Sequence, residues 1–414
     1  MIEASSYAEE LAGGEKRKES LRGLLGAATV LFRSYERLYV QFEEPISLRA
    51  LALRRLGERT ASLTIDEAWE GEAARSSTTI LAPGARDAPA GAKRQLVQAV
   101  GNWIAYGISR AVTITPVGLV SAALLSHARR GMSAREVEER VELLRYIAAE
   151  GGARFARDLA GAPSDPRQPG PIGDAVRRLS LQGLVRVELA AGDTIYQVVD
   201  DKRMLLDYHR NAVIHRYVAP ALVALAACSA RADEPLEATR ARALGVSRLF
   251  KLEFMYRVGA TFDLIFDQNV AFLERVGALA RTPEGGLRAG PQAERLTFLA
   301  EFMRPYLEAY RLTLGTALAA CDAHTAVDRK ALVREAQERG RAAFLSGQIA
   351  AREALNKATI GNAVEWLLDQ QLLVEADDDG KVRLGRGGPD ALRQVLGGQA
   401  LLDYPFVPGG PPGG

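Results

Sequence analysis

The sequence predicts a mainly α-helical fold: a helical domain with three helix plus β-hairpin (winged-helix-like) units, preceded by the C-terminal remnant of an α/β domain. Two observations lead to this fold class, namely an internal repeat and a series of long helical patterns between the repeated units. The chain has 414 residues, of which 48% are hydrophobic and 25% are charged. These values are typical of a globular protein and exclude a disordered or collagen-like chain.

The repeat consists of a helical pattern followed by a short hairpin. The helical patterns at residues 175–179, 269–273 and 363–367 are each 94 residues apart. Turns follow at residues 192–193, 284–286 and 379–380, where glycine supplies the positive φ that a tight hairpin requires. The period lies far above the range of about 20–50 residues that is usual in solenoids, so we interpret the units as modules within one helical domain.

Long helical patterns separate these units. We expect helices over residues 202–230, 236–257, 292–320 and 329–355, with a kink at Pro305. Earlier in the chain, Leu96, Val100, Ile104 and Ile108 recur every four residues and predict another helix. Ser133 followed by Glu136 predicts a capping box at the start of a helix that ends at Gly151-Gly152.

The N-terminal part has a different pattern. Residues 21–32 form an amphipathic helical pattern, and residues 38–42 alternate like a β-strand. A strand needs partners, and no other strand pattern lies near it, so we interpret residues 1–70 as the end of an α/β domain. The helix is interpreted either as packed on that sheet, which we favour, or as a membrane-surface helix behind the basic run at residues 16–18.

The remaining boundaries follow from composition. Residues 71–93 are rich in Gly, Ala, Pro and Ser and are expected to form a linker or loop. The helical domain is expected over residues 94–405, and residues 406–414 are expected to be a flexible tail.

Charge and cysteine content exclude several classes of protein. The net charge of +2 offers no general electrostatic basis for binding nucleic acid, and the repeat units lack a repeated basic helix, so no nucleic acid partner is expected. Two cysteines cannot form a disulfide framework, which fits a reducing cytoplasm. The most apolar stretches, 111–126 and 217–230, fall short of about 18 uninterrupted apolar residues. We therefore expect a soluble chain or one attached to a membrane surface.

A search for catalytic chemistry finds few candidates. None of the four histidines has metal-ligand spacing, and no phosphate loop is present, so no metal or cofactor is expected. Arg210, Asn211 and His215 are candidate ligands for a phosphate or carboxylate, because they lie with Tyr208 on one predicted helix. The alternative, which we favour, is that these polar groups bond to neighbouring loops. Glu253 and Arg257 are interpreted as a solvated i, i+4 pair on a helix.

Several segments in order resemble one family, the bacterial membrane-associated glycerol-3-phosphate 1-O-acyltransferases, which are related to dihydroxyacetone-phosphate acyltransferases. The segments are residues 6–11, 15–21, 38–46, 114–120, 123–126, 208–215, 251–254 and 353–357. The run Tyr208-His209-Arg210-Asn211-Ala212-Val213-Ile214-His215 carries a strong part of the likeness. The resemblance implies transfer of a fatty acyl group from acyl-CoA or acyl carrier protein to the sn-1 hydroxyl of glycerol 3-phosphate, in phospholipid biosynthesis at the cytoplasmic face of the cell membrane.

The sequence departs from this family at its catalytic motif. The family uses a His-x4-Asp motif in an α/β domain, with the histidine as general base on the hydroxyl. The residues five positions after the four histidines are Met132, Ile214, Pro220 and Arg329. The phosphate-binding block is also absent, so no catalytic residue is predicted and the chain alone is expected to be inactive. We expect a C-terminal portion of such an enzyme, with a separate catalytic chain as one source of the motif. The alternative is a non-catalytic helical interaction module that scaffolds a partner acyltransferase.

Overall fold

The structure is a computed structural model, and it describes residues 10–11, 37–51, 90–126, 131–160, 170–231, 234–321, 326–376 and 380–398. The chain divides into two compact units. The first unit comprises Met1–Tyr39, Thr113–Phe254 and Thr261–Gly414, and the second comprises Val40–Val112 and Met255–Ala260. The predicted helix over 21–32, most of the predicted linker, the tail, His127 and His324 lie outside the described residues.

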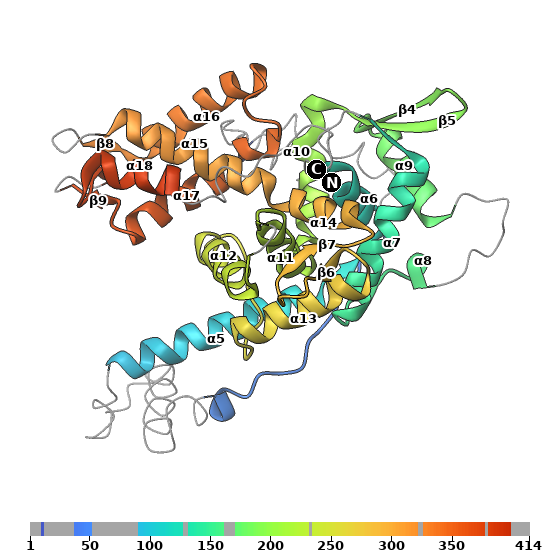
Figure 1. The fold of residues 1–414 in the computed structure, drawn as a ribbon, viewed down its shortest axis with the longest axis horizontal. Coiled ribbons are helices and arrows are strands. Elements are labelled where there is room, and N and C mark those ends of the chain that lie inside the picture. Colours follow the sequence, from blue (N-terminus) through green and yellow to red (C-terminus); the bar gives the residue numbers. More distant parts are fainter. Residues whose placement is uncertain are drawn as a thin grey trace, which may run out of the picture. The chain divides into compact units, whose positions relative to one another are not determined.

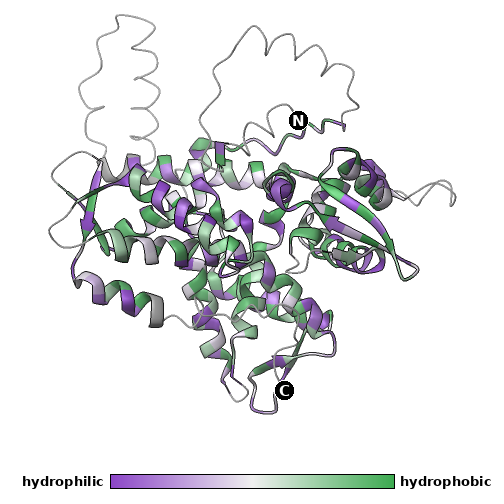
Figure 2. Cartoon of the chain, turned by 90° about the horizontal axis from the view of Figure 1, so that it is seen from above, coloured by the Kyte–Doolittle hydropathy of each residue, from purple (hydrophilic) through white to green (hydrophobic). Residues whose placement is uncertain are grey.

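The mainly α-helical class is confirmed, and Figure 1 shows helices with a few short strands between them. Apolar and polar residues are mixed along the same helices in Figure 2, as expected of amphipathic helices. The three predicted combinations of a helix and a hairpin are present in the first unit. They are α9 (Pro171–Leu181) with β4 (Val185–Ala190) and β5 (Asp193–Val198), α13 (Phe262–Arg275) with β6 (Leu279–Arg281) and β7 (Leu287–Ala289), and α17 (Lys357–Asp369) with β9 (Leu373–Glu375) and β10 (Lys381–Leu384).

Backbone geometry confirms the repeat at equivalent positions. The residue that leaves each of these helices has a positive φ: 68° at Gly183, 71° at Gly277 and 57° at Gln371. The hairpin turns use Gly192, Gly285 and Gly380, with φ between 83° and 87°. The sequence therefore places the left-handed residues at the same points of all three units.

The first and third hairpins each gain a third antiparallel strand from earlier in the chain. β2 (Gly131–Ser133) pairs with β5, and β8 (Val327–Asp328) pairs with β10, which gives the strand orders β2-β5-β4 and β8-β10-β9. The second hairpin, β6-β7, pairs with no further strand among the described residues. A short parallel pair joins β1 (Thr113–Ile114) to β3 (Arg154–Phe155).

The remaining helices of the first unit pack around these hairpins. α6 (Pro116–Leu125) and α11 (Val218–Cys228) are apolar and almost wholly buried. α15 (Arg304–Ala320) packs against α16 (Arg329–Leu345), α17 and α18 (Gly388–Gly398) (Figure 1). The other elements are α7 (Ala134–Glu150), α8 (Arg157–Ala160), η1 (Asp200–Lys202), α10 (Arg203–Asn211), η2 (Ile214–Arg216), α12 (Leu236–Leu249), α14 (Ala293–Ala300), η3 (Glu301–Met303) and η4 (Arg352–Leu355). The Ser133 half of the predicted capping box is confirmed, because the Ser133 hydroxyl accepts a hydrogen bond from the Glu136 N–H. The Glu136 carboxylate accepts a hydrogen bond from Arg140 Nη2 instead.

Two long predicted helices end earlier than the sequence indicates, and a third is divided. The helix predicted over 236–257 stops at Leu249, because Phe250 turns into a cluster of aromatic rings with Tyr306 and Tyr310. The helix predicted over 329–355 stops at Leu345, since Gly347 takes a φ of 77° and its N–H bonds to the Phe344 carbonyl. The pattern over 292–320 divides at η3, and Pro305 lies in the first turn of α15, where the kink was predicted.

The second unit contains α5 (Ala90–Ala111), which packs on a short helical turn at residues 48–51. The strand predicted over 38–42 is wrong, because residues 37–47 have no regular secondary structure and find no strand partner among the described residues. The predicted apolar face of α5 is also not uniform. Leu96 is buried but Ile104 and Ile108 are exposed, since each step of four residues turns about 40° beyond a full helical turn.

Candidate functional site

The candidate ligands Arg210, Asn211 and His215 lie around the end of α10, but one helix does not carry them all. The helix predicted over 202–230 is divided into α10 and α11, with η2 between them. Pro220 explains the break, because it has no N–H for the Arg216 carbonyl and its ring would clash there in a continuous helix. His215 therefore lies in η2, beyond the helical face of Tyr208 and Asn211.

Arg210 points into a buried ion cluster, which we define as Arg203, Asp207, Arg210 and Glu353. Arg210 forms an ion pair with Asp207 one turn earlier, and the two side chains are only 2% and 3% exposed. Arg203 Nε donates a hydrogen bond of 2.8 Å to Glu353 Oε1, which ties α10 to η4. Two guanidinium groups thus face two carboxylates inside the first unit.

Burial shifts the pKa values of two members of this cluster. Burial raises the pKa of Asp207, Arg210 lowers it, Glu353 adds to the rise, and Asn211 and Arg203 oppose it, so that the net pKa is about 6. Burial lowers the pKa of Arg210, but Asp207, Tyr306 and Glu353 together outweigh burial, so the pKa of Arg210 is raised. Each buried guanidinium group has a carboxylate partner, which offsets the cost of its burial.

Asn211 and His209 complete the surroundings of the cluster. Asn211 Nδ2 donates a hydrogen bond of 3.2 Å to Asp207 Oδ2, although the Asn211 residue is exposed. Burial lowers the pKa of His209 to about 4, so its imidazole is neutral at pH 7 and accepts a proton weakly. A general base suited to neutral pH would need a pKa near 7. The role of Arg210, Asn211 and His215 in substrate binding stays a prediction.

Three of the segments that carry the family resemblance belong to α10 or pack against it, namely residues 114–120, 208–215 and 353–357. On α6, a Cβ added at Gly118 would lie 2.8 Å from Val213 Cγ1, so the absence of a side chain at Gly118 lets α6 approach the end of α10. Glu353 brings the segment at residues 353–357 to Arg203. These likenesses therefore mark close packing and internal ion pairs in the first unit.

Glu253 is half-buried beside α15 and α17 and does not lie on a solvated helix surface. The interpretation of Glu253 and Arg257 as an i, i+4 pair is wrong, because α12 ends at Leu249. The Tyr310 hydroxyl donates a hydrogen bond of 3.1 Å to Glu253 Oε1. Burial raises the pKa of Glu253 to about 7, and hydrogen bonds from Asn362, Tyr310 and Thr359 counteract that rise. A carboxyl that exchanges its proton near neutral pH thus lies beside α15 and α17.

The sequence reasoning identified Arg210 but not its partners. Asp207 stands three residues before Arg210, a spacing that predicts a contact on one helix face. Arg203 and Glu353 are 150 residues apart, and no local pattern links them. Among the described residues, no group of three His, Cys, Asp or Glu side chains could hold a metal ion.

Fold and site together define a helical domain with three helix plus hairpin units and a buried ion cluster that links its helices. Residues 7–376 match the family model described as "Glycerol-3-phosphate acyltransferase C-terminal region". This chain belongs to that family.

Named relatives agree with this assignment. The chain is 25% identical over 417 residues to a glycerol-3-phosphate acyltransferase of Pseudomonas putida (strain GB-1), in an alignment that covers 97% of this chain and 46% of the relative. It is 28% identical over 227 residues to a glycerol-3-phosphate acyltransferase of Xanthomonas campestris pv. campestris, covering 54% of this chain and 22% of the relative. The chain thus spans about half the length of the Pseudomonas relative.

Proposed function

We propose that this chain forms the helical C-terminal part of a glycerol-3-phosphate 1-O-acyltransferase. In the proposed reaction, the sn-1 hydroxyl of glycerol 3-phosphate attacks the thioester of acyl-CoA or acyl carrier protein, and the product enters phospholipid biosynthesis. The observation that supports this assignment most strongly is the family match over residues 7–376.

The proposal assigns the chemical step to residues outside this sequence. Deprotonating a hydroxyl as it attacks a thioester needs a positioned base, and the expected base is the histidine of a His-x4-Asp motif. No histidine of the chain has an aspartate five residues later. Asp207 and His209, whose pKa values are shifted, do not provide that base, because Asp207 is paired with Arg210 and burial makes the His209 imidazole a weak base.

An assay of the purified chain tests whether the chemical step depends on residues outside this sequence. Radiolabelled glycerol 3-phosphate is incubated with acyl-CoA, and separately with acyl carrier protein thioester, with and without the His-x4-Asp domain of a relative. We expect no product above background from the chain alone and product formation when the domain is added. Acylation of glycerol 3-phosphate by the chain alone at an enzyme-like rate would contradict the proposal that the catalytic base lies outside this sequence. No increase with any added domain would contradict a role in the reaction.

A second candidate function is a non-catalytic module that scaffolds a separate acyltransferase chain. It is favoured by Leu38 and Phe42, which are apolar and largely exposed in a segment without a strand partner among the described residues. Such a segment offers main-chain groups and alternating side chains to the sheet of another domain. Affinity capture on the tagged chain would recover a protein with a His-x4-Asp motif; capture lost in a Leu38→Ser/Phe42→Ser variant would locate the contact.

We further propose that the chain acts at the cytoplasmic face of the cell membrane as a peripheral protein. No helix among the described residues is long and apolar enough to cross a membrane. Attachment would therefore use a surface of the folded chain, and α5 provides one.

A further inference from the structure

Helix α5 carries an apolar stripe that the other described residues of the second unit leave uncovered. Val97, Ile104 and Ile108 are 65%, 48% and 64% exposed. Gly101 lies in the same row, because the positions 97, 101, 104 and 108 follow the i, i+4, i+7, i+11 spacing of one helix face. A Cβ at Gly101 would meet no described atom within 4 Å. We name Val97, Gly101, Ile104 and Ile108 the α5 stripe.

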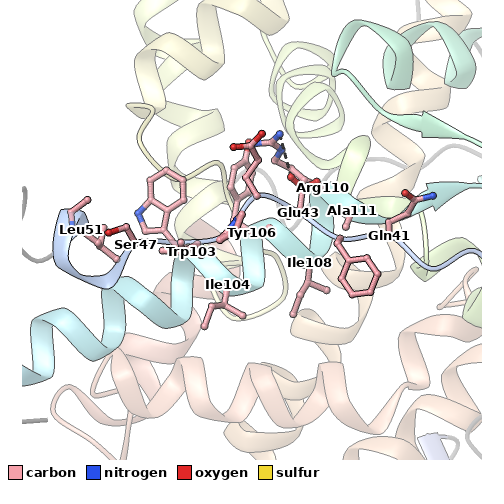
Figure 3. Close-up of a pocket in the computed structure, with 16 residues that line it drawn as sticks. Gln41, Glu43, Ser47, Leu51, Trp103, Ile104, Tyr106, Ile108, Arg110 and Ala111 are labelled. Carbon is pink, nitrogen blue, oxygen red and sulfur yellow. Dashed lines mark hydrogen bonds and ion pairs between the residues drawn. The ribbon is translucent and has the colours of Figure 1, made fainter. Parts of the chain in front are cut away.

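The opposite side of α5 is occupied by the second unit's own small core. Leu96 and Ala99 form a buried cluster with Leu51, and Val100 and Trp103 pack against it. In Figure 3, Ile104 and Ile108 point to one side of the helix, while Trp103 and Tyr106 point to the other. The helix therefore has one face that is packed within the unit and another that is apolar and exposed.

A cavity of about 600 Å³ adjoins the α5 stripe. It lies between α5 and residues 41–51, and its lining includes Phe42, Ile104 and Ile108. Its polar lining includes Gln41, Glu44, Ser47 and the ion pair of Arg110 Nη2 with Glu43 Oε2, at 3.5 Å (Figure 3). The exposed apolar face thus continues into a partly apolar recess, which can take flexible hydrocarbon chains.

Charge in the second unit indicates which partner this face would meet. α5 contains Lys93, Arg94 and Arg110 and no acidic residue. Arg94 is exposed and lies three residues before Val97, next to the stripe on the helix surface, whereas Arg110 is paired with Glu43 at the cavity. An apolar helix face with an adjacent basic side chain, on a helix without acidic residues, complements a surface with anionic headgroups above hydrocarbon.

We propose that the α5 stripe is a membrane-binding face of this chain, which lies on the surface of a bilayer that contains anionic lipids. Ile104 and Ile108 enter the boundary between headgroups and acyl chains, and Arg94 beside the stripe contacts the headgroups. The inference rests on the proposed peripheral location and adds the face and the class of lipid. It does not rest on the acyl-transfer reaction.

Sedimentation with lipid vesicles tests the proposal on the full-length chain. Vesicles of phosphatidylglycerol and phosphatidylcholine at equal parts are compared with vesicles of phosphatidylcholine alone. We expect the chain to sediment with the anionic vesicles and much less with the neutral ones. An Ile104→Ser/Ile108→Ser variant should lose at least tenfold in apparent affinity for the anionic vesicles. Equal binding of this variant and the unmodified chain would overturn the proposal, as would no binding by the unmodified chain.

A matched control separates the stripe from general surface hydrophobicity. Val187 and Leu189 on β4 are 47% and 83% exposed, comparable to Ile104 and Ile108, but lie in the first unit. A Val187→Ser/Leu189→Ser variant should bind vesicles like the unmodified chain, and an equal loss in both variants would contradict a specific role of α5. Circular dichroism shows that each variant is folded.

Two further outcomes distinguish the alternatives. Light scattering measures the oligomeric state of the same proteins without lipid. A dimer that dissociates in the Ile104→Ser/Ile108→Ser variant, with vesicle binding unchanged, would assign the stripe to a second copy of the chain and overturn the lipid proposal. The acyl-transfer assay in detergent measures the proposed function separately. If acyl transfer fails but the chain still binds vesicles, the membrane-binding role of the α5 stripe is retained and the proposed function is contradicted. If acyl transfer succeeds but the chain does not bind vesicles, only the membrane-binding role is contradicted.

Discussion

The two units of the chain differ in where they place charged and apolar side chains. The first unit buries an ion cluster of Arg203, Asp207, Arg210 and Glu353 in its interior and covers the apolar helices α6 and α11. The second unit leaves the apolar α5 stripe exposed, and its Arg49 and Arg94 are exposed as well. Burial of charge requires partners at fixed positions, whereas an exposed apolar row calls for a partner that the described residues do not supply. We infer that the first unit is organised for rigidity and the second for contact.

The largest expected effect concerns the buried ion cluster. Arg210→Ala leaves the carboxylate of Asp207 without its counter-charge in a buried site, and we expect a loss of about 3–5 kcal/mol in the free energy of unfolding. Urea denaturation followed by circular dichroism measures it. Arg393→Ala is the matched control, because Arg393 and Asp390 have the same i, i+3 spacing but are 64% and 88% exposed. This control should lose at most about 1 kcal/mol.

Equal losses of unfolding free energy in Arg210→Ala and Arg393→Ala would show that the buried ion pair contributes no more to stability than the exposed one. An Asp207→Asn/Arg210→Met double variant sharpens the test. It removes both charges together, so we expect it to be more stable than Arg210→Ala alone. A double variant that is less stable than Arg210→Ala would show that the ion pair stabilises the folded chain by more than the cancellation of two buried charges.

The next effect concerns the pH dependence of the first unit. Burial raises the pKa of Glu253 to about 7, so the folded chain binds this proton more tightly than the unfolded chain does. The resulting stability is fully present below the unfolded pKa and is lost as the pH rises toward 7. Glu253→Gln keeps an oxygen acceptor for the Tyr310 hydroxyl without titrating. From pH 5 to pH 8, the free energy of unfolding of the variant should rise by about 2 kcal/mol relative to that of the unmodified chain. This value is smaller than the pKa shift alone would give, because the carboxyl is only half-buried.

Urea denaturation at several pH values measures this difference. Asp207 and Glu308, whose pKa values burial also raises to about 6, are present in both proteins, so their contributions cancel in the comparison. A difference between Glu253→Gln and the unmodified chain that stays constant from pH 5 to pH 8 would contradict a raised pKa at Glu253.

A smaller effect is expected where α6 meets the end of α10. In Gly118→Ala, the new methyl group would lie 2.8 Å from Val213 Cγ1 and 3.3 Å from Thr115 Oγ1, so the two elements must move apart. We expect a loss of about 1–3 kcal/mol from overpacking, despite the higher helix propensity of alanine. Gly315→Ala in α15 is the control, because its Cβ would meet no described atom within 4 Å. Thermal unfolding compares the two, and a stabilised Gly118→Ala variant would refute the close approach.

The sequence predicted the parts of the fold that depend on local residues. The helix and hairpin units follow from glycines such as Gly192 and Gly285, which enforce turns through their backbone alone, and the cap at Ser133 needs only three further residues. Long helical patterns were less informative about where helices end. Phe250 leaves α12 to join a tertiary aromatic cluster, and that cause lies 56 residues away at Tyr306.

The site shows the same division between local and distant causes. Arg210 could be selected from the sequence, because it stands among polar residues on a predicted helix. Its burial could not be predicted, since that depends on Arg203 meeting Glu353 across 150 residues. The exposure of Ile104 and Ile108 was missed for a different reason. Apolar periodicity shows that a helix has an apolar face but does not show what that face meets.

The smallest expected effect concerns the α5 stripe itself. Ile108 is 64% exposed, and isoleucine and serine have similar helix propensities, so Ile108→Ser should change the free energy of unfolding by at most about 0.5 kcal/mol. Leu119→Ala in the buried helix α6 should cost about 2–5 kcal/mol under the same conditions. Urea denaturation compares the two variants. A loss above about 1.5 kcal/mol in Ile108→Ser would mean that the stripe is packed within the folded chain and is not free to lie on a membrane. If stability is unchanged, a loss of vesicle binding in the serine variants cannot come from unfolding. It is then caused by the removal of the apolar side chains of the α5 stripe.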